Sequence, residues 1–133
     1  MQKIKTFLMF EGKAEEAMNF YVSLFPASEI TSISRYGAKE AGPEGTVQQA
    51  VFSIQGQQFM CIDSFVAHGF SFTPAMSLHV TCEKEAEIEL LFAKLSEGGQ
   101  TLMPLDAYPF SKRYAWLNDK YGVSWQLMLA EGE

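Results

Sequence analysis

Histidine and cysteine, two residue types often used for acid–base, nucleophilic or metal chemistry, occur only twice each in this sequence and are widely spaced. The two histidines, His68 and His79, have no acidic partners at helical spacing, so a dedicated metal site is not indicated. His68 lies beside a glycine in a loop and is expected to be solvated. His79 could act as a general base or bind a substrate, since an imidazole changes charge near neutral pH. The alternative is a histidine hydrogen-bonded within the fold.

Two cysteines and one arginine are the other reactive candidates. Cys61 and Cys82 form no CxxC pair, and Cys61 has no cationic neighbour in sequence, which favours a small buried thiol over a nucleophile. With no recognisable secretory leader, both are expected to be reduced thiols of a cytoplasmic protein. Arg113 begins a predicted strand and could hold a carboxylate or phosphate; the alternative is a surface ion pair.

Composition limits the partners of this chain. Its 133 residues include 10 basic and 16 acidic side chains, a net charge of −6, which argues against a nucleic-acid surface and against a polybasic membrane patch. No apolar run approaches the roughly 18 residues of a membrane span. Seven methionines and eleven phenylalanines supply more adaptable apolar surface than a minimal core requires, so we expect a pocket or an interface.

The elements that must position these residues alternate between strand and helix patterns. The first strand is apolar on both faces, which predicts a central position in its sheet. Gly98-Gly99 is expected to cap the second helix. Loops carrying aromatic residues are predicted at 64–74 and 104–111, where they would cover a ligand or meet a partner chain, or else pack back onto their own sheets. Strands are predicted at 3–10, 30–36, 46–54, 59–62, 76–82, 113–117 and 124–129, with a short apolar piece at 101–103, and helices at 14–25 and 85–97.

The same order of elements occurs twice. Ala14-Glu15 followed by Phe20 recurs as Ala86-Glu87 followed by Phe92. This repeat predicts an α+β fold of two βαβββ modules, residues 1–64 and 75–133, within a single domain. Their curved mixed sheets are expected to form a shared cleft.

Three parts of the sequence carry a resemblance to a known family. The first unit, the second helix ending in SEGGQTLMPL and above all the segment WLNDKYGVSWQL resemble the PhnB-like branch of the vicinal oxygen chelate superfamily, which includes glyoxalase I, extradiol dioxygenases and bleomycin-resistance proteins. The resemblance covers nearly the whole chain and implies the glyoxalase/bleomycin-resistance-like fold and a homodimer. PhnB-like proteins are also catalogued under a ubiquinone-methyltransferase label, which the sequence does not support, because no glycine-rich turn follows a parallel strand.

The resemblance also implies where metal ligands would lie. In the superfamily, metal enzymes draw one His or Glu from the first and last strand of each module. The matching positions here are Thr6, Cys61 or Met60, Ala75 or Ser77, and Gln126. None of them is an imidazole or a carboxylate, so we expect a metal-free protein without a cofactor.

Together these observations predict a protein that binds a small-molecule ligand in an apolar, methionine-lined cleft. One alternative is a metal-independent enzyme that uses His79 and Arg113 for acid–base chemistry. Another is a non-catalytic dimeric module that sequesters a compound or regulates a partner. The expected ligand-binding residues are Thr6, Met60, Cys61, Ser77, His79, Arg113 and Gln126.

Overall fold

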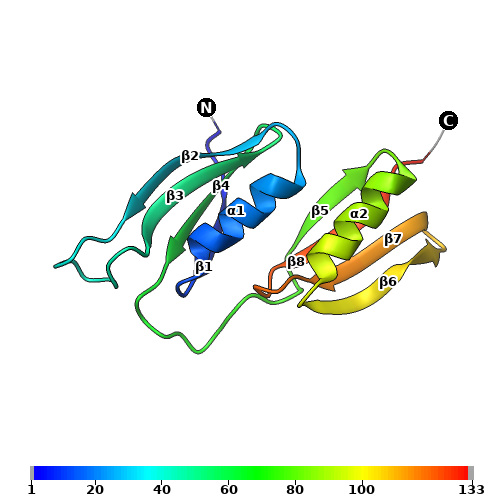
Figure 1. Cartoon of the computed structure of the whole chain (residues 1–133). Helices are drawn as coiled ribbons and strands as arrows, with labels where there is room; N and C mark the ends of the chain where they lie inside the picture. Colours follow the sequence, from blue (N-terminus) through cyan, green and yellow to red (C-terminus); the bar gives the residue numbers. More distant parts are fainter. Residues whose placement is uncertain (1, 132–133) are drawn as a thin grey trace. The chain divides into compact units, whose positions relative to one another are not determined.

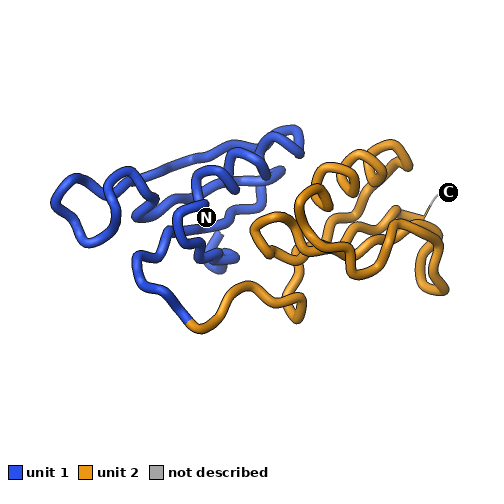
Figure 2. Tube along the Cα trace, turned by 60° about the horizontal axis from the view of Figure 1, so that its bottom comes forward, with its two compact units in different colours: residues 1–68 blue, residues 69–133 orange. Residues whose placement is uncertain are grey.

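The computed structural model describes residues 2–131 and divides into two compact units between His68 and Gly69 (Figure 2). Each unit contains one four-stranded mixed sheet and one helix that lies across one face of that sheet (Figure 1). Both units follow the order strand, helix, strand, strand, strand. The predicted α+β class and the two βαβββ modules are therefore confirmed.

In the first unit the strand order is β1-β4-β3-β2, with β1 parallel to β4 and the other pairs antiparallel. The prediction that the first strand is central is wrong, because β1 lies at the edge of its sheet. Only one of its two apolar faces belongs to the core: Leu8 and Phe10 are buried, whereas Phe7 points to the other side of the sheet and is 52% exposed. The elements are β1 (Thr6–Phe10), α1 (Ala14–Leu24), β2 (Ser28–Arg35), β3 (Val47–Ile54) and β4 (Gln57–Asp63).

In the second unit the strand order is β5-β8-β7-β6, again with one parallel pair, β5 and β8. Most of the predicted loop at 104–111 is strand, because β6 continues through Pro104 to Tyr108 and β7 begins at Ser111. An edge strand tolerates proline, and the register shifts between Met103 and Asp106. The elements are β5 (Ser77–Cys82), α2 (Glu85–Ser96), β6 (Gln100–Tyr108), β7 (Ser111–Asn118) and β8 (Ser124–Leu129).

Each helix buries its apolar stripe on one face of its own sheet. In α1 this stripe includes Ala17, Met18 and Tyr21, and in α2 it includes Ile88 and Leu95, all fully buried. Because side chains alternate along a strand, every second residue points to the face that no helix of the same unit covers. We call these faces the first open face (β1–β4) and the second open face (β5–β8).

A buried carboxylate ties the first unit together. Asp63, only 3% exposed, ends β4 and accepts hydrogen bonds from three backbone N–H groups. Its Oδ1 binds Gly12 (2.8 Å) and Ala14 (2.9 Å) at the start of α1, and its Oδ2 binds Val47 (2.9 Å) at the start of β3. One side chain therefore positions the ends of three elements, since a buried carboxylate is tolerated only where its oxygens are paired.

The second unit contains a buried carboxylate of the same kind in a different place. Asp119, 2% exposed, follows β7 and accepts backbone N–H groups of Tyr121 (2.8 Å) and Val123 (3.1 Å) with Oδ1. Its Oδ2 accepts the indole N–H of Trp125 (2.9 Å). These bonds shape the turn between β7 and β8 and hold the first residues of β8.

The connection from α2 to β6 approaches that same turn closely. As predicted, Gly98-Gly99 follows the helix, and Gly98 has a φ of 76°, a value that favours glycine. At Gly99 the constraint is space, because an added Cβ would lie 2.1 Å from the carbonyl oxygen of Asn118.

We therefore expect Gly99→Ala to lower the free energy of unfolding by on the order of 2 kcal/mol, since the backbone of the turn must shift to accept the methyl group. Urea denaturation followed by tryptophan fluorescence measures this loss. Gly69→Ala is the matched control, because no atom lies within 4 Å of its added Cβ. Equal stability of the two variants would contradict the close approach.

Candidate functional site

Three of the predicted site residues lie together on the second open face. Strands β5 and β8 are parallel and in register, with Ser77 opposite Ser124 and His79 opposite Gln126. Their neighbours Leu78 and Leu127 alternate to the helix side. Ser77, His79 and Gln126 are thus adjacent across two strands at the centre and edge of one sheet.

Hydrogen bonds fix most of the polar side chains on this face. The indole N–H of Trp116 donates to Ser124 Oγ at 2.9 Å, and Ser124 Oγ lies 2.7 Å from Ser77 Oγ. The hydroxyl of Tyr114 donates to Gln126 Oε1 at 2.6 Å. His79 is exposed and forms no hydrogen bond or ion pair within residues 2–131.

An aromatic group borders these side chains. The rings of Tyr108 and Phe110 stack with their centroids 5.7 Å apart, and both meet the ring of Tyr114 edge-on. Tyr114 is consequently only 5% exposed, although it points away from α2. Burial, followed by the neighbouring Tyr108, raises the pKa of the Tyr114 hydroxyl, which therefore stays protonated at neutral pH.

Packing back onto the same unit, one of the two alternatives left open by the sequence, is seen for some of the loop aromatics. Tyr108 and Phe110 pack onto their own sheet, although Phe110 remains 55% exposed. Phe65 meets Tyr36 edge-on with 6.0 Å between centroids, while Phe70 keeps 64% of its surface exposed.

In the first unit, the predicted site residues lie on different faces. Register pairs Thr6 with Phe59 and Leu8 with Cys61, which places both Thr6 and Cys61 on the side of α1. Met60 points to the first open face. A shift of one residue exchanges the two faces of a strand, which is why Met60 takes the position otherwise assigned to Cys61.

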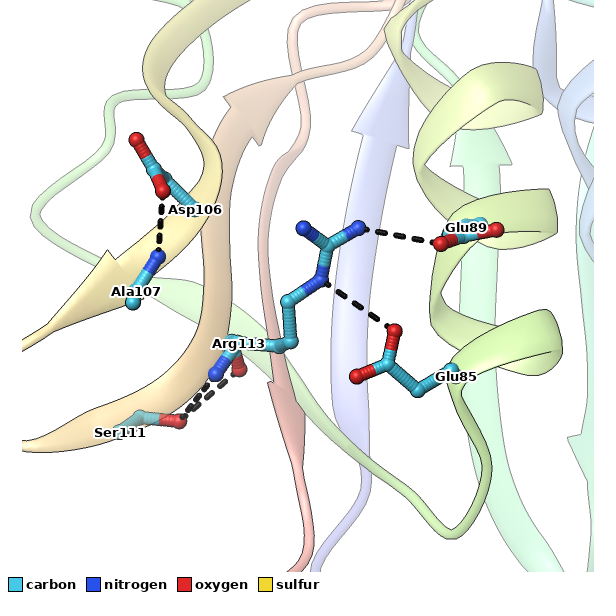
Figure 3. Close-up of polar contacts among 6 residues, drawn as sticks. All are labelled: Glu85, Glu89, Asp106, Ala107, Ser111 and Arg113. Atoms are coloured by element: carbon cyan, nitrogen blue, oxygen red, sulfur yellow. Dashed lines mark hydrogen bonds and ion pairs between the residues drawn. The ribbon is translucent and has the colours of Figure 1, made fainter.

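Arg113 lies on the side of the second sheet that faces α2 (Figure 3). Its Nη2 is 3.2 Å from Glu89 Oε2, and its Nε is 3.8 Å from Glu85 Oε2. The ion pair that the sequence left as an alternative is therefore present. Arg113 and His79 lie on opposite faces of the sheet, so the structure does not bring together the pair required for the predicted acid–base alternative.

The side chains at the family's metal-ligand positions do not fit a divalent ion. Of the predicted ligand positions, Met60, Ser77 and Gln126 lie on the open faces and Thr6 and Cys61 on the side of α1. None of these side chains is an imidazole or a carboxylate. Within residues 2–131, no group of three His, Cys, Asp or Glu side chains could hold a metal. The shared cleft stays a prediction, because it depends on the arrangement of the two units.

The fold is that of glyoxalase and bleomycin-resistance proteins. A glyoxylase/bleomycin resistance protein/dioxygenase domain from Frankia matches with a TM-score of 0.67 at 14% identity, covering 100% of this chain and 96% of that one. The fosfomycin resistance protein FosX from Listeria monocytogenes, solved with Mn(II) and a dihydroxypropylphosphonic acid, matches with a TM-score of 0.65 at 13% identity, covering 96% and 90%. Both similarities concern the fold alone.

Within this fold, the chain belongs to the family described as 3-demethylubiquinone-9 3-methyltransferase, which it matches over residues 2–128. A PhnB protein from Bacillus cereus is 69% identical, with a TM-score of 0.96 and coverage of 97% of this chain and 100% of that one. No curated protein matches the chain at a significant level. The predicted PhnB-like resemblance is confirmed.

The activity in the family description requires a methyl donor, and the turn between β1 and α1 is not suited to hold one. Such a cofactor normally rests on free backbone N–H groups in a turn between a parallel strand and a helix. In the turn between β1 and α1, the N–H groups of Gly12 and Ala14 are occupied by Asp63. The residues of this turn therefore do not fit a methyl-donor site.

The two cysteines are buried and free, and their chemistry follows from burial. Burial raises the pKa of Cys61 to about 12, with a contribution from the Asp63 carboxylate. Burial also raises the pKa of Cys82 to about 12, with a contribution from Glu87. Neither thiol is suited to act as a nucleophile.

We expect neither cysteine to react with an excess of iodoacetamide at about pH 8 while the protein is folded, since the thiolate is the reactive form. In urea, both should be alkylated. Mass spectrometry of the intact chain counts the additions under each condition. Labelling of the folded protein at the rate seen in urea would show that one of these thiols is accessible and ionised.

Proposed function

We propose that this protein binds a small organic molecule on the second open face without a metal ion, using Ser77, His79 and Gln126. The observation that carries this proposal is the hydrogen-bonded arrangement of Trp116, Ser124 and Ser77 beside an exposed His79 that has no partner within the described residues. A sheet face that served only as core or as plain surface would not need such ordered polar groups.

The surroundings support a ligand of mixed character. Binding sites for small molecules combine apolar walls with a few polar groups that fix orientation. The rings of Tyr108, Phe110 and Tyr114 supply the apolar part next to Gln126. FosX, which has the same fold, was solved with a small phosphonic acid, and this supports small-molecule binding as a use of the fold.

The role of the other predicted residues in binding differs by face. Met60 can contribute apolar surface on the first open face, whereas Thr6, Cys61 and Arg113 point toward helices. Catalysis by His79 would need a partner other than Arg113. Binding without chemistry, as in a sequestering module, requires no further group.

We also propose that the protein is cytoplasmic and forms a homodimer through the edge strand β1. Two buried free thiols are typical of a reducing compartment. Within residues 2–131, neither helix is long and apolar enough to cross a membrane. In the sheet of the first unit, β1 pairs with β4 alone among the described strands and so forms an edge. The exposed apolar side chains of Phe7 in this strand (52%) and of Ile4 just before it (85%) favour pairing with a second copy.

The binding site is tested with His79→Ala in a thermal-shift screen of small aromatic carboxylates, amides and amines. We expect at least one compound to raise the melting temperature of the wild type, and His79→Ala to remove that shift while melting normally without the compound. Thr81→Ala is the matched control, because Thr81 is exposed on the same face two residues along β5. An unchanged shift in His79→Ala, or no shift with any compound, would refute the site.

The dimer is tested by sedimentation equilibrium at micromolar concentration. We expect the wild type to have twice the mass of one chain and Phe7→Asp to be monomeric, since a charge cannot be buried unpaired in an apolar contact. Leu90→Asp serves as the control, because Leu90 is similarly exposed (56%) but lies on α2. A monomeric wild type would refute the homodimer.

A further inference from the structure

The hydrogen bonds on the second open face have a fixed direction. An amide oxygen can only accept, so the hydroxyl of Tyr114 must be the donor to Gln126 Oε1. This bond occupies the amide oxygen of Gln126 and directs its Nε2 group away from Tyr114. Gln126 is partly exposed, and its Nε2 has no partner within residues 2–131. Two N–H donors are therefore available to a ligand.

The hydrogen bonds that link Trp116, Ser124 and Ser77 also have a fixed direction. An indole N–H can only donate, so Ser124 Oγ accepts from Trp116. Ser124 is only 1% exposed, and the acceptor within hydrogen-bond distance of its hydroxyl is Ser77 Oγ. Asn118 is opposite Ser124 in the register, but its buried Oδ1 has no hydrogen-bond partner.

Leaving the buried Ser124 hydroxyl without an acceptor would be costly, so it donates to Ser77. The hydroxyl hydrogen of Ser77, which is partly exposed, then points away from Ser124. The chain of bonds from Trp116 through Ser124 ends in a donor at Ser77. His79 follows Ser77 on the same face of β5 and lies opposite Gln126 in the register, and it can donate from a ring nitrogen in either tautomer.

We propose that the second open face recognises a carboxylate attached to an aromatic ring, with the donors of Ser77, His79 and Gln126 directed at the carboxylate oxygens. This inference rests on the proposed function and names its ligand class. A carboxylate accepts several hydrogen bonds, and bonds to a charged acceptor are stronger than bonds to a neutral one. The rings of Tyr108 and Phe110, packed on Tyr114, provide the surface for the aromatic part.

Tyr114 is a positioning residue in this proposal, because it acts through the orientation of Gln126. Without its hydroxyl, the amide of Gln126 can rotate and present its oxygen to the ligand. A ligand with an N–H donor, such as a primary amide, would then gain relative to a carboxylate. A role limited to stability would leave this preference unchanged.

The test compares naphthoate with the neutral naphthamide and the cationic naphthylmethylamine, which share one ring system, by NMR titration at constant pH and salt. We expect the wild type to bind naphthoate at least about tenfold more tightly than either analogue. In Tyr114→Phe the ratio of naphthoate to naphthamide affinity should fall by about tenfold. Thr81→Ala should retain the wild-type ratio, because Thr81 lies on the same face but takes no part in the hydrogen bond that orients Gln126.

The outcomes separate this inference from the proposed function. If naphthamide or the amine binds more tightly than naphthoate and this binding is lost in His79→Ala, the preference for a carboxylate is refuted but the proposed binding site is retained. No binding of any of the three would overturn both. An unchanged affinity ratio in Tyr114→Phe would refute the positioning role. Where Tyr114→Phe fails to fold, Trp116→Phe replaces it, since loss of the indole N–H lets Ser124 accept from Ser77 and should lower the naphthoate preference.

Discussion

Each four-stranded sheet has one helix to cover it, and this constraint determines what every strand residue can do. Because side chains alternate along a strand, half of them enter the core beneath the helix and half point to the open face. The alternation buries Cys61 beside α1 and leaves Met60 on the first open face. It likewise directs Arg113 to the acidic side chains of α2, while Ser77, His79 and Gln126 collect on the second open face. Whether a strand residue of this protein packs beneath the helix or belongs to the proposed binding face thus depends largely on its odd or even position along the strand.

The two buried aspartates fix where several strands begin, and this determines which of their residues point to the open face. Asp119 binds the backbone of the β7–β8 turn and the indole of Trp125, and so fixes where β8 begins. With β8 fixed, Gln126 is the first residue after Trp125 and points to the open face within reach of Tyr114. Asp63 plays the corresponding part in the first unit, and in doing so it occupies the N–H groups at the start of α1. The same bonds that stabilise the first unit therefore remove a common anion-binding position from it.

Much of this arrangement follows from local sequence pattern, and the rest depends on contacts that local pattern does not contain. The period of two in β5 was sufficient to place Ser77 and His79 on one face, and the repeat of elements predicted both modules. The register of β1 against β4 was not predictable to one residue, which reversed the orientation expected for Thr6. Glu89 lies 24 positions from Arg113, and Gly12 lies 51 positions from Asp63, so no spacing rule identifies these partners. Tyr114 and Trp116 were not predicted as residues of the candidate site. Their roles depend on hydrogen bonds to oxygen atoms of Gln126 and Ser124 on the neighbouring strand, β8.

In the proposed site, hydrogen-bond donors of fixed direction would take the place that a metal ion has in related proteins. A divalent cation binds an oxygen ligand through its charge. Neutral hydrogen-bond donors can also bind an oxygen atom if their orientation is fixed, so that their N–H and O–H groups stay directed at it. Trp116 and Tyr114 supply that restriction through Ser124 and Gln126. A tyrosine hydroxyl is protonated at neutral pH, and burial raises the pKa of Tyr114 further, so its hydroxyl remains a donor and the orientation of Gln126 is kept. The selectivity of the proposed site for an acceptor should therefore be built into the sheet itself, and the imidazole of His79 adds to it without being its source.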